Sequence, residues 1–341
     1  MIDNMDNHAT EMLSVQDLKT HFFTEKGVVK AVDGISFSLD YGDTLGIVGE
    51  SGCGKSITAR SLMRLVPPPN GRIVSGQVLL DGRDLLKLSK EQMRKIRGLE
   101  ISMIFQDPMT SLNPVFQVGD QLSEAIRLHQ NISKKESWNE SIEMLKKVGI
   151  PSPEQRVTNF PHQLSGGMRQ RVMIAMALSC KPKLLIADEP TTALDVTIQA
   201  QIMFLLNELK RQTGSSIILI THDMGIIAEM TQKVLVMYAG RIVESAEVKR
   251  LFECHYHPYT EGLLRSIPRL DSRSRGKLSV IPGTVPSMLS LPQGCKFSNR
   301  CTKSFGKCRE SEPELYRIDE NHHVRCWLYE NSQLYTEKRH V

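Results

Sequence analysis

The feature that most constrains this chain is a glycine-rich turn after the short apolar run 45–48. It fits the pattern G-x-x-x-x-G-K-[ST], and a helical pattern opens directly behind it. Glycines let backbone N–H groups curl around a polyphosphate without side-chain clash, and a helix N-terminus adds partial positive charge. The sequence therefore predicts a phosphate-binding loop formed by Gly49, Glu50, Ser51, Gly52, Cys53, Gly54, Lys55, Ser56 and Ile57.

Two side chains of this loop carry the chemistry that a bound nucleotide needs. Lys55 is expected to reach the outer phosphates, and the Ser56 hydroxyl is expected to be a ligand of Mg²⁺. The alternative is a strand-to-helix turn that binds nothing. The strand before the loop and the helix after it favour nucleotide binding.

Length and charge narrow the class of protein. A chain of 341 residues exceeds the usual single domain, so one large domain with an appendage, or two domains, is expected. The net charge of +5 is spread without a long basic run, which argues against a nucleic-acid partner. No apolar stretch approaches the roughly 18 residues that cross a bilayer. The first residues are acidic and lack an apolar core, so we expect an intracellular protein without a signal peptide.

Hydrophobic periodicity divides the chain into segments of different type. The first forty-odd residues alternate as antiparallel strands do, and residues 76–82 read as a short strand with an Asp-Gly turn. Residues 107 to about 180 read as a helical subdomain inserted in an α/β core. Apolar runs at 184–187, 217–220 and 234–237 alternate with helices, which is typical of parallel strands. The pattern fades near residue 260, which predicts domains at 1–260 and 261–341.

Two further motifs carry chemistry. The strand at 184–187 delivers Asp188 and Glu189 at its carboxyl end, where Asp188 can hold magnesium and Glu189 can polarise an attacking water. Ser165 is a plausible helix N-cap, and Gly166 and Gly167 leave backbone amides bare, which makes a second anion-binding helix terminus.

These motifs, in this order, resemble those of ATP-binding-cassette (ABC) ATPases over residues 13 to about 255. The resemblance implies an α/β fold: an ABC-type P-loop ATPase with an antiparallel β subdomain, an inserted α-helical subdomain and a small cysteine-bearing C-terminal extension. It also implies that Gln106 senses magnesium and the transmembrane partner, and that His222 contacts the γ-phosphate. Phe22 matches the aromatic residue that stacks on adenine, with Phe23 as the alternative.

In this family two subunits face each other, so that ATP on the loop of one is covered by the helix terminus of the other. The resemblance thus implies that ATP on Lys55 and Ser56 is capped by Ser165 of a second subunit. Hydrolysis at Glu189 would release the pair, and a monomer would bind nucleotide but hydrolyse it poorly.

Longer stretches, at 106–114, 257–260 and 281–286, resemble the D-type ATPase subunits of oligopeptide and dipeptide importers. The resemblance implies a peripheral protein on the cytoplasmic face of the membrane, without nucleic acid. Its partners would be a second ATPase subunit (a related F-type chain or itself), two permease subunits and, indirectly, an external substrate-binding protein. Nickel or glutathione import, a soluble non-transport ABC ATPase and an iron or redox sensor are the alternatives.

Of the seven cysteines, four crowd into the C-terminal segment. Their spacing lacks the tight C-x-x-C knuckle of structural zinc, and intracellular disulfides are not expected. Thiolates in a small, core-poor segment suggest a metal staple. The family resemblance implies a [4Fe–4S] cluster, with zinc and unligated reduced thiols as alternatives; the residues concerned are Cys295, Cys301, Cys308 and Cys326.

Overall fold

The computed structural model describes residues 11–107, 111–192, 194–267 and 281–331. Contacts divide the chain into two compact units, each drawn from separate stretches of sequence. The first unit is mainly residues 87–220, with 39–43 added. The second is made of residues 12–38, 44–86 and the chain from 221 onward. The acidic first residues lie outside the described part.

The first unit has three parallel strands, paired in the order β6, β7, β8. All of their residues are buried, as expected of strands covered on both faces. The strands are β6 (Ile101–Ile104), β7 (Leu184–Asp188) and β8 (Ser216–Ile220), and helix α8 (Val196–Thr213) lies between β7 and β8 in the sequence. The predicted runs at 184–187 and 217–220 are thus both strands, and each extends one residue further.

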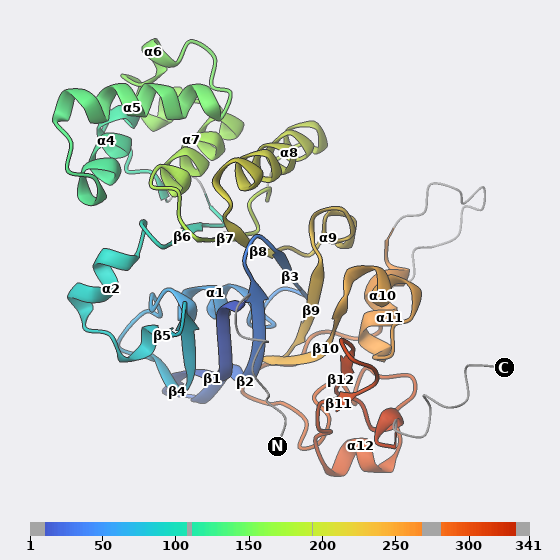
Figure 1. The fold of residues 1–341 in the computed structure, drawn as a ribbon. Helices are drawn as coiled ribbons and strands as arrows, with labels where there is room; N and C mark the ends of the chain where they lie inside the picture. The colour runs from blue at the N-terminus through green and yellow to red at the C-terminus, as the bar shows by residue number, and fades with distance from the viewer. Residues whose placement is uncertain (1–10, 108–110, 193, 268–280, 332–341) are drawn as a thin grey trace, which may run out of the picture. The chain divides into compact units, whose positions relative to one another are not determined.

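Between β6 and β7 the chain is helical, as predicted. Helix α7 packs on α4, α5 and β6, and Figure 1 shows these helices grouped together in green. The Ser123 and Ser137 hydroxyls bond at 2.6 Å between α4 and α5. Besides α8, the helices among the described residues of this unit are α2 (Lys90–Ile96), α4 (Val118–His129), α5 (Lys134–Lys147), α6 (Pro153–Arg156) and α7 (Gly166–Leu178).

The second unit opens with an antiparallel sheet in the order β2, β1, β4, β5. Its Asp81-Gly82 turn has positive φ at both residues, as a two-residue hairpin requires. Strand β4 begins five residues before the predicted Gly76, because Gly71 pairs with Phe22 of β1. The strands are β1 (Glu11–Thr24), β2 (Gly27–Asp40), β4 (Gly71–Leu80) and β5 (Arg83–Asp84).

A second sheet in this unit runs in the order β11, β12, β10, β9, β3. Strands β3 and β9 pair in parallel, and the C-terminal strands add antiparallel edges through Glu244 opposite Val324. The strands are β3 (Thr44–Val48), β9 (Lys233–Tyr238), β10 (Arg241–Glu247), β11 (Tyr316–Arg317) and β12 (His323–Val324). The helices are α1 (Lys55–Leu62), α9 (Met224–Met230), α10 (Val248–Glu253), α11 (Pro258–Arg265) and α12 (Gly306–Glu310).

A buried polar network ties the C-terminal segment to β10. Glu244 is fully buried, and its carboxylate accepts the N–H groups of Tyr256 and His257 at 2.7 and 3.0 Å and contacts His322 Nε2 at 2.8 Å. His257 Nδ1 in turn accepts the Tyr259 N–H at 3.1 Å and caps α11. Across the described ranges, no helix is long and apolar enough to cross a membrane.

We predict that His257 makes the fold sensitive to acid. Burial lowers its pKa from 6.5 to about 4, although Glu244 opposes the shift. The unfolded chain therefore binds this proton more readily, and stability falls by up to about 3 kcal/mol as pH drops from 6.5 to 4. His257→Asn keeps a capping acceptor and should lose less stability over this window in urea unfolding. The exposed His162→Asn is the control, and an unchanged pH slope in His257→Asn would contradict the prediction.

Candidate nucleotide site

The predicted phosphate loop joins the fully buried strand β3 to helix α1. Gly49 and Gly54 have φ values of +153° and +109°. A Cβ on Gly49 would lie 2.3 Å from the Met237 carbonyl oxygen, and one on Gly54 would lie 2.3 Å from that of Ala31. Only glycine fits where two backbones approach so closely. The loop conformation is therefore dictated by its neighbours in the second unit.

The lysine of the loop folds back over it. Lys55 is buried, and its Nζ donates to the carbonyl oxygens of Gly49 and Glu50 at 2.7 and 3.1 Å. Ser56 and Ile57 follow in the first turn of α1, and both are half-buried. Cys53 is buried, which raises the pKa of its thiol and keeps it uncharged beside Lys55. The structure thus gathers residues 49–57 around one turn.

The two predicted carboxylates end β7 in the first unit. Asp188 is the last residue of the strand and is 2% exposed. Glu189 has φ of +47°, an uncommon backbone conformation outside glycine, and its N–H donates to the Ile220 carbonyl at 2.9 Å. Gln106 Nε2 and Thr192 Oγ1 both donate to Glu189 Oε2 at 3.0 Å. Gln106 and Glu189, 83 positions apart, are therefore brought together; Thr192 was not predicted.

The predicted helix terminus at Ser165 is a true N-cap. Its Oγ accepts the Met168 N–H at 3.3 Å at the start of α7. Gly166 is open, since an added Cβ would meet nothing within 4 Å, whereas one on Gly167 would lie 3.2 Å from Ile198 Cγ2. The buried Gln170, which the sequence did not single out, donates to the Pro190 carbonyl. It thereby links α7 to the segment after Glu189.

The histidine and the aromatic residue predicted for the nucleotide site lie in the second unit. His222 is exposed in the turn before α9, and the neighbouring Thr221 N–H donates to the Ile47 carbonyl at 3.2 Å. Phe22 is half-buried against Gly71, where an added Cβ would lie 2.9 Å from its ring. Phe23 is 41% exposed and has the Arg72 guanidinium 5.4 Å from its ring centroid. The two aromatic candidates therefore have different surroundings.

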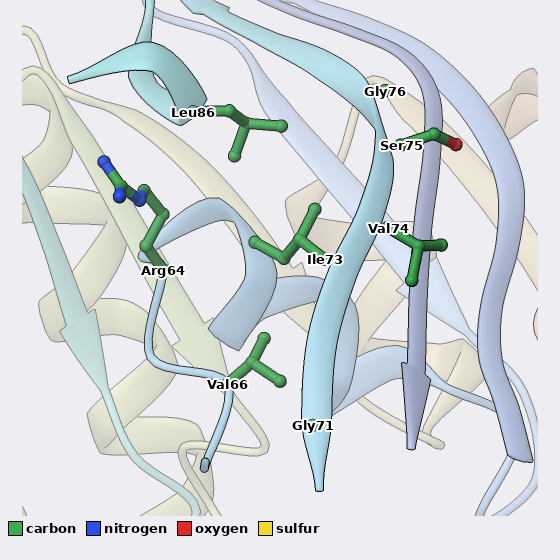
Figure 2. A pocket seen from close by; sticks show the side chains of 8 residues that line it. All are labelled: Arg64, Val66, Gly71, Ile73, Val74, Ser75, Gly76 and Leu86. Atoms are coloured by element: carbon green, nitrogen blue, oxygen red, sulfur yellow. The ribbon is translucent and has the colours of Figure 1, made fainter. Parts of the chain in front are cut away.

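A groove of about 400 Å³ lies along β4 in the second unit (Figure 2). None of the predicted site residues lines it, and its walls are mostly aliphatic or glycine. The lining residues are Arg64, Val66, Gly71, Ile73, Val74, Ser75, Gly76 and Leu86.

The four C-terminal cysteines lie near one another. The Cys295 N–H donates to the Cys308 carbonyl at 2.8 Å, and Cys308 and Cys326 are buried. Burial, with a smaller contribution from neighbouring thiols, raises the pKa of Cys295 to about 11 and that of Cys326 to about 12. The donors suit a thiophilic metal. Yet no group of three or more His, Cys, Asp or Glu among the described residues has a metal-binding arrangement.

Two family models match the chain. The model described as "ABC transporter" matches residues 32–192, and "Oligopeptide/dipeptide transporter, C-terminal region" matches residues 243–308. The oligopeptide transport ATP-binding protein OppD of Bacillus subtilis is 50% identical over 319 residues, covering 94% of this chain and 89% of that protein. The dipeptide transport ATP-binding protein DppD of the same organism is 52% identical over 318 residues, covering 93% and 95%.

The chain belongs to the ABC transporter ATP-binding proteins, in the group with the oligopeptide/dipeptide C-terminal region. It is an ABC-type ATPase, as the sequence predicted. A similar solved structure is the dimeric cassette MJ0796 with ADP and Pi, with TM-score 0.63, 25% identity and coverage of 70% of this chain and 99% of that one. Another is cbiO1 from Clostridium perfringens, with TM-score 0.60, 29% identity and coverage of 72% and 91%.

We predict that the phosphate loop tolerates alanine at Gly52 but not at Gly54. Both residues have positive φ, so each alanine costs about 1–2 kcal/mol in backbone strain. Only at Gly54 does the new Cβ also collide with backbone. Gly54→Ala should therefore lower the midpoint of thermal unfolding clearly more than Gly52→Ala. Equal midpoints would show that the loop is not held as the structure describes.

Proposed function

We propose that this chain is the ATP-hydrolysing subunit that energises peptide import through a membrane ABC transporter. The observation that carries the proposal is the similarity to oligopeptide and dipeptide transport ATP-binding proteins over 93–94% of this chain, which includes the C-terminal region as well as the cassette. The chain itself would be peripheral, on the cytoplasmic face of the membrane. Its partners would be two permease subunits and, indirectly, an external binding protein.

The loop residues 49–57 are proposed to hold the nucleotide. The Lys55 ammonium, which donates to the carbonyl oxygens of Gly49 and Glu50, would turn to the outer phosphates. Phe22 would stack on adenine. Mg²⁺ prefers hard oxygen donors, so the Ser56 hydroxyl, Asp188 carboxylate and Gln106 carbonyl oxygen suit it. When bound, it would neutralise phosphate charge.

Hydrolysis is assigned to Glu189. Its carboxylate would orient and polarise the attacking water, and His222 would contact the γ-phosphate. The hydrogen bond from Gln106 to Glu189 supports this role, because it orients the carboxylate before ATP arrives. A substitution of Gln106 would then remove a hydrogen bond that orients the Glu189 carboxylate.

A second ATPase subunit is proposed to complete each site. The N-terminus of α7, with Ser165, Gly166 and Gly167, offers bare amides and an open glycine to the phosphates bound by a partner. ATP would hold two subunits together, and loss of the γ-phosphate would release them. The second subunit is a related F-type chain or another copy of this one.

The proposed domains are residues 1–260, the nucleotide-binding domain, and residues 261–341, the C-terminal extension.

We predict that Glu189→Gln leaves ATP binding intact and nearly abolishes hydrolysis, because the amide cannot accept the proton of the attacking water. Nucleotide affinity and phosphate release are measured on the same preparation. Glu91→Gln, an exposed position in the first turn of helix α2, serves as the matched control. Wild-type turnover in Glu189→Gln would refute the assignment.

The transported solute is tested by uptake. A strain that lacks this chain should lose import of labelled di- and oligopeptides and regain it with wild-type protein but not with Glu189→Gln. Retained peptide uptake with lost nickel or glutathione uptake would redirect the assignment to those solutes. Pull-down with ribosomes or DNA and without permeases would favour a soluble non-transport ATPase.

We further propose that Cys295, Cys301, Cys308 and Cys326 ligate a [4Fe–4S] cluster. Support comes from the soft donor set and from its gathering in a small segment. Ligation would require all four thiols to lose their protons. The raised pKa values of Cys295 and Cys326 oppose this loss, and a bound metal cation favours it.

We predict that protein purified without oxygen contains about four irons per chain, by the composition of such a cluster, and absorbs visible light. Cys326→Ser should lose both signals, whereas Cys180→Ser, outside the segment, should keep them. Stoichiometric zinc instead of iron would show a zinc site, and the absence of both metals would show unligated reduced thiols; either result would contradict the cluster.

A further inference from the structure

The side chain of Glu50, the second residue of the phosphate loop, is paired with a residue 250 positions away. Arg300 Nη1 and Nη2 donate to the two Glu50 carboxylate oxygens at 2.6 and 3.0 Å, in a bidentate pair. The Arg300 side chain is only 5% exposed and that of Glu50 is 28% exposed. Such shielded, two-pronged pairs are the strong class of ion pair, unlike surface salt bridges.

Arg300 is itself fixed by its surroundings in the C-terminal segment. Its Nε donates to the Pro282 carbonyl at 2.9 Å, and the guanidinium lies 5.9 Å from the ring centroids of both Tyr238 and Phe297. The hydrogen bonds to Glu50 raise the pKa of the guanidinium further, so it stays charged. Glu50 is thus held by a rigid group, not by a mobile surface side chain.

The backbone of Glu50 is held by the same part of the chain. Its N–H donates to the Tyr259 hydroxyl at 2.8 Å, and Tyr259 is fully buried against Tyr238 and Phe297. The Glu50 carbonyl accepts Lys55 Nζ at 3.1 Å. Tyr259 and Arg300, which follow the cassette motifs in the sequence, therefore both bind Glu50, whose carbonyl oxygen contacts Lys55.

We propose that Arg300 is a positioning residue of the nucleotide site, which neutralises and orients Glu50 so that the phosphate loop can accept an anion. A carboxylate in a loop that binds polyphosphate opposes the ligand by charge repulsion unless a cation compensates it. Arg300 supplies that cation from the C-terminal segment. The affinity for nucleotide therefore depends on the C-terminal segment being docked. The inference rests on the proposed assignment of residues 49–57 as the nucleotide site.

The test measures MgADP affinity of the full-length protein by calorimetry, since ADP avoids hydrolysis. Arg300→Met keeps an unbranched side chain between the two rings and removes only the charge and the donors. It should weaken MgADP roughly tenfold, within the range usual for coupled sites. Lys303→Ala, which removes an exposed ion pair with Glu261 from the same segment, is the matched control and should bind as wild type.

A second variant separates positioning from mere anchoring of the segment. In Glu50→Gln/Arg300→Met no carboxylate is left uncompensated, so MgADP affinity should return to within about threefold of the wild type, a difference below 1 kcal/mol. Wild-type affinity in Arg300→Met, or a double variant as weak as the single one, overturns the proposal. If Arg300→Met does not fold, Arg300→Gln, which also removes the charge, replaces it: weakened affinity supports the proposal and wild-type affinity overturns it.

Lys55→Ala in the same assay separates a failure of the role of Arg300 from a failure of the assignment of the phosphate loop. Lost MgADP binding in Lys55→Ala together with wild-type binding in Arg300→Met overturns the role of Arg300 alone. Wild-type binding in Lys55→Ala overturns the loop assignment itself, and with it the basis of the inference.

Discussion

The phosphate loop owes its shape to backbone contacts that leave no room for side chains. Two of its glycines face carbonyl oxygens of Met237 and Ala31 at distances that exclude a Cβ. The Cys53 carbonyl accepts the Gly240 N–H at 2.9 Å, so the loop is also bonded to the turn between β9 and β10. A loop that directs its backbone amides at an anion has to be held in shape by other contacts. Here backbone groups of neighbouring segments hold it, and its glycines let them approach closely.

The C-terminal segment contributes to the same arrangement. Lys296 bonds to Asp33 Oδ2 and to the Ala239 carbonyl, both at 3.0 Å, and Phe297 completes an aromatic cluster with Tyr238 and Tyr259. These contacts place Arg300 against Glu50. The segment that carries the cysteines is therefore packed on the part of the second unit that contains the phosphate loop, and it is not a loose appendage.

Much of the fold could be predicted from local patterns. The hairpin at Asp81-Gly82, the helices between β6 and β7 and the buried parallel strands follow from turn chemistry and hydrophobic periodicity. Element ends were less predictable: β4 starts at Gly71, not Gly76, because its partner strand β1 extends the pairing. Pairing partners far apart in sequence leave no local signal at the end of a strand.

The sequence was enough to predict the kind of ligand and the residue types proposed to surround it, because the motif at 49–56, the pair Asp188-Glu189 and the N-cap Ser165 each have a particular local chemistry. Tertiary structure alone decided which of these residues touch. It brought Gln106 to Glu189 and set Arg300 on Glu50. These contacts join positions 83 and 250 residues apart, and in the sequence Arg300 looks like any solvated surface charge.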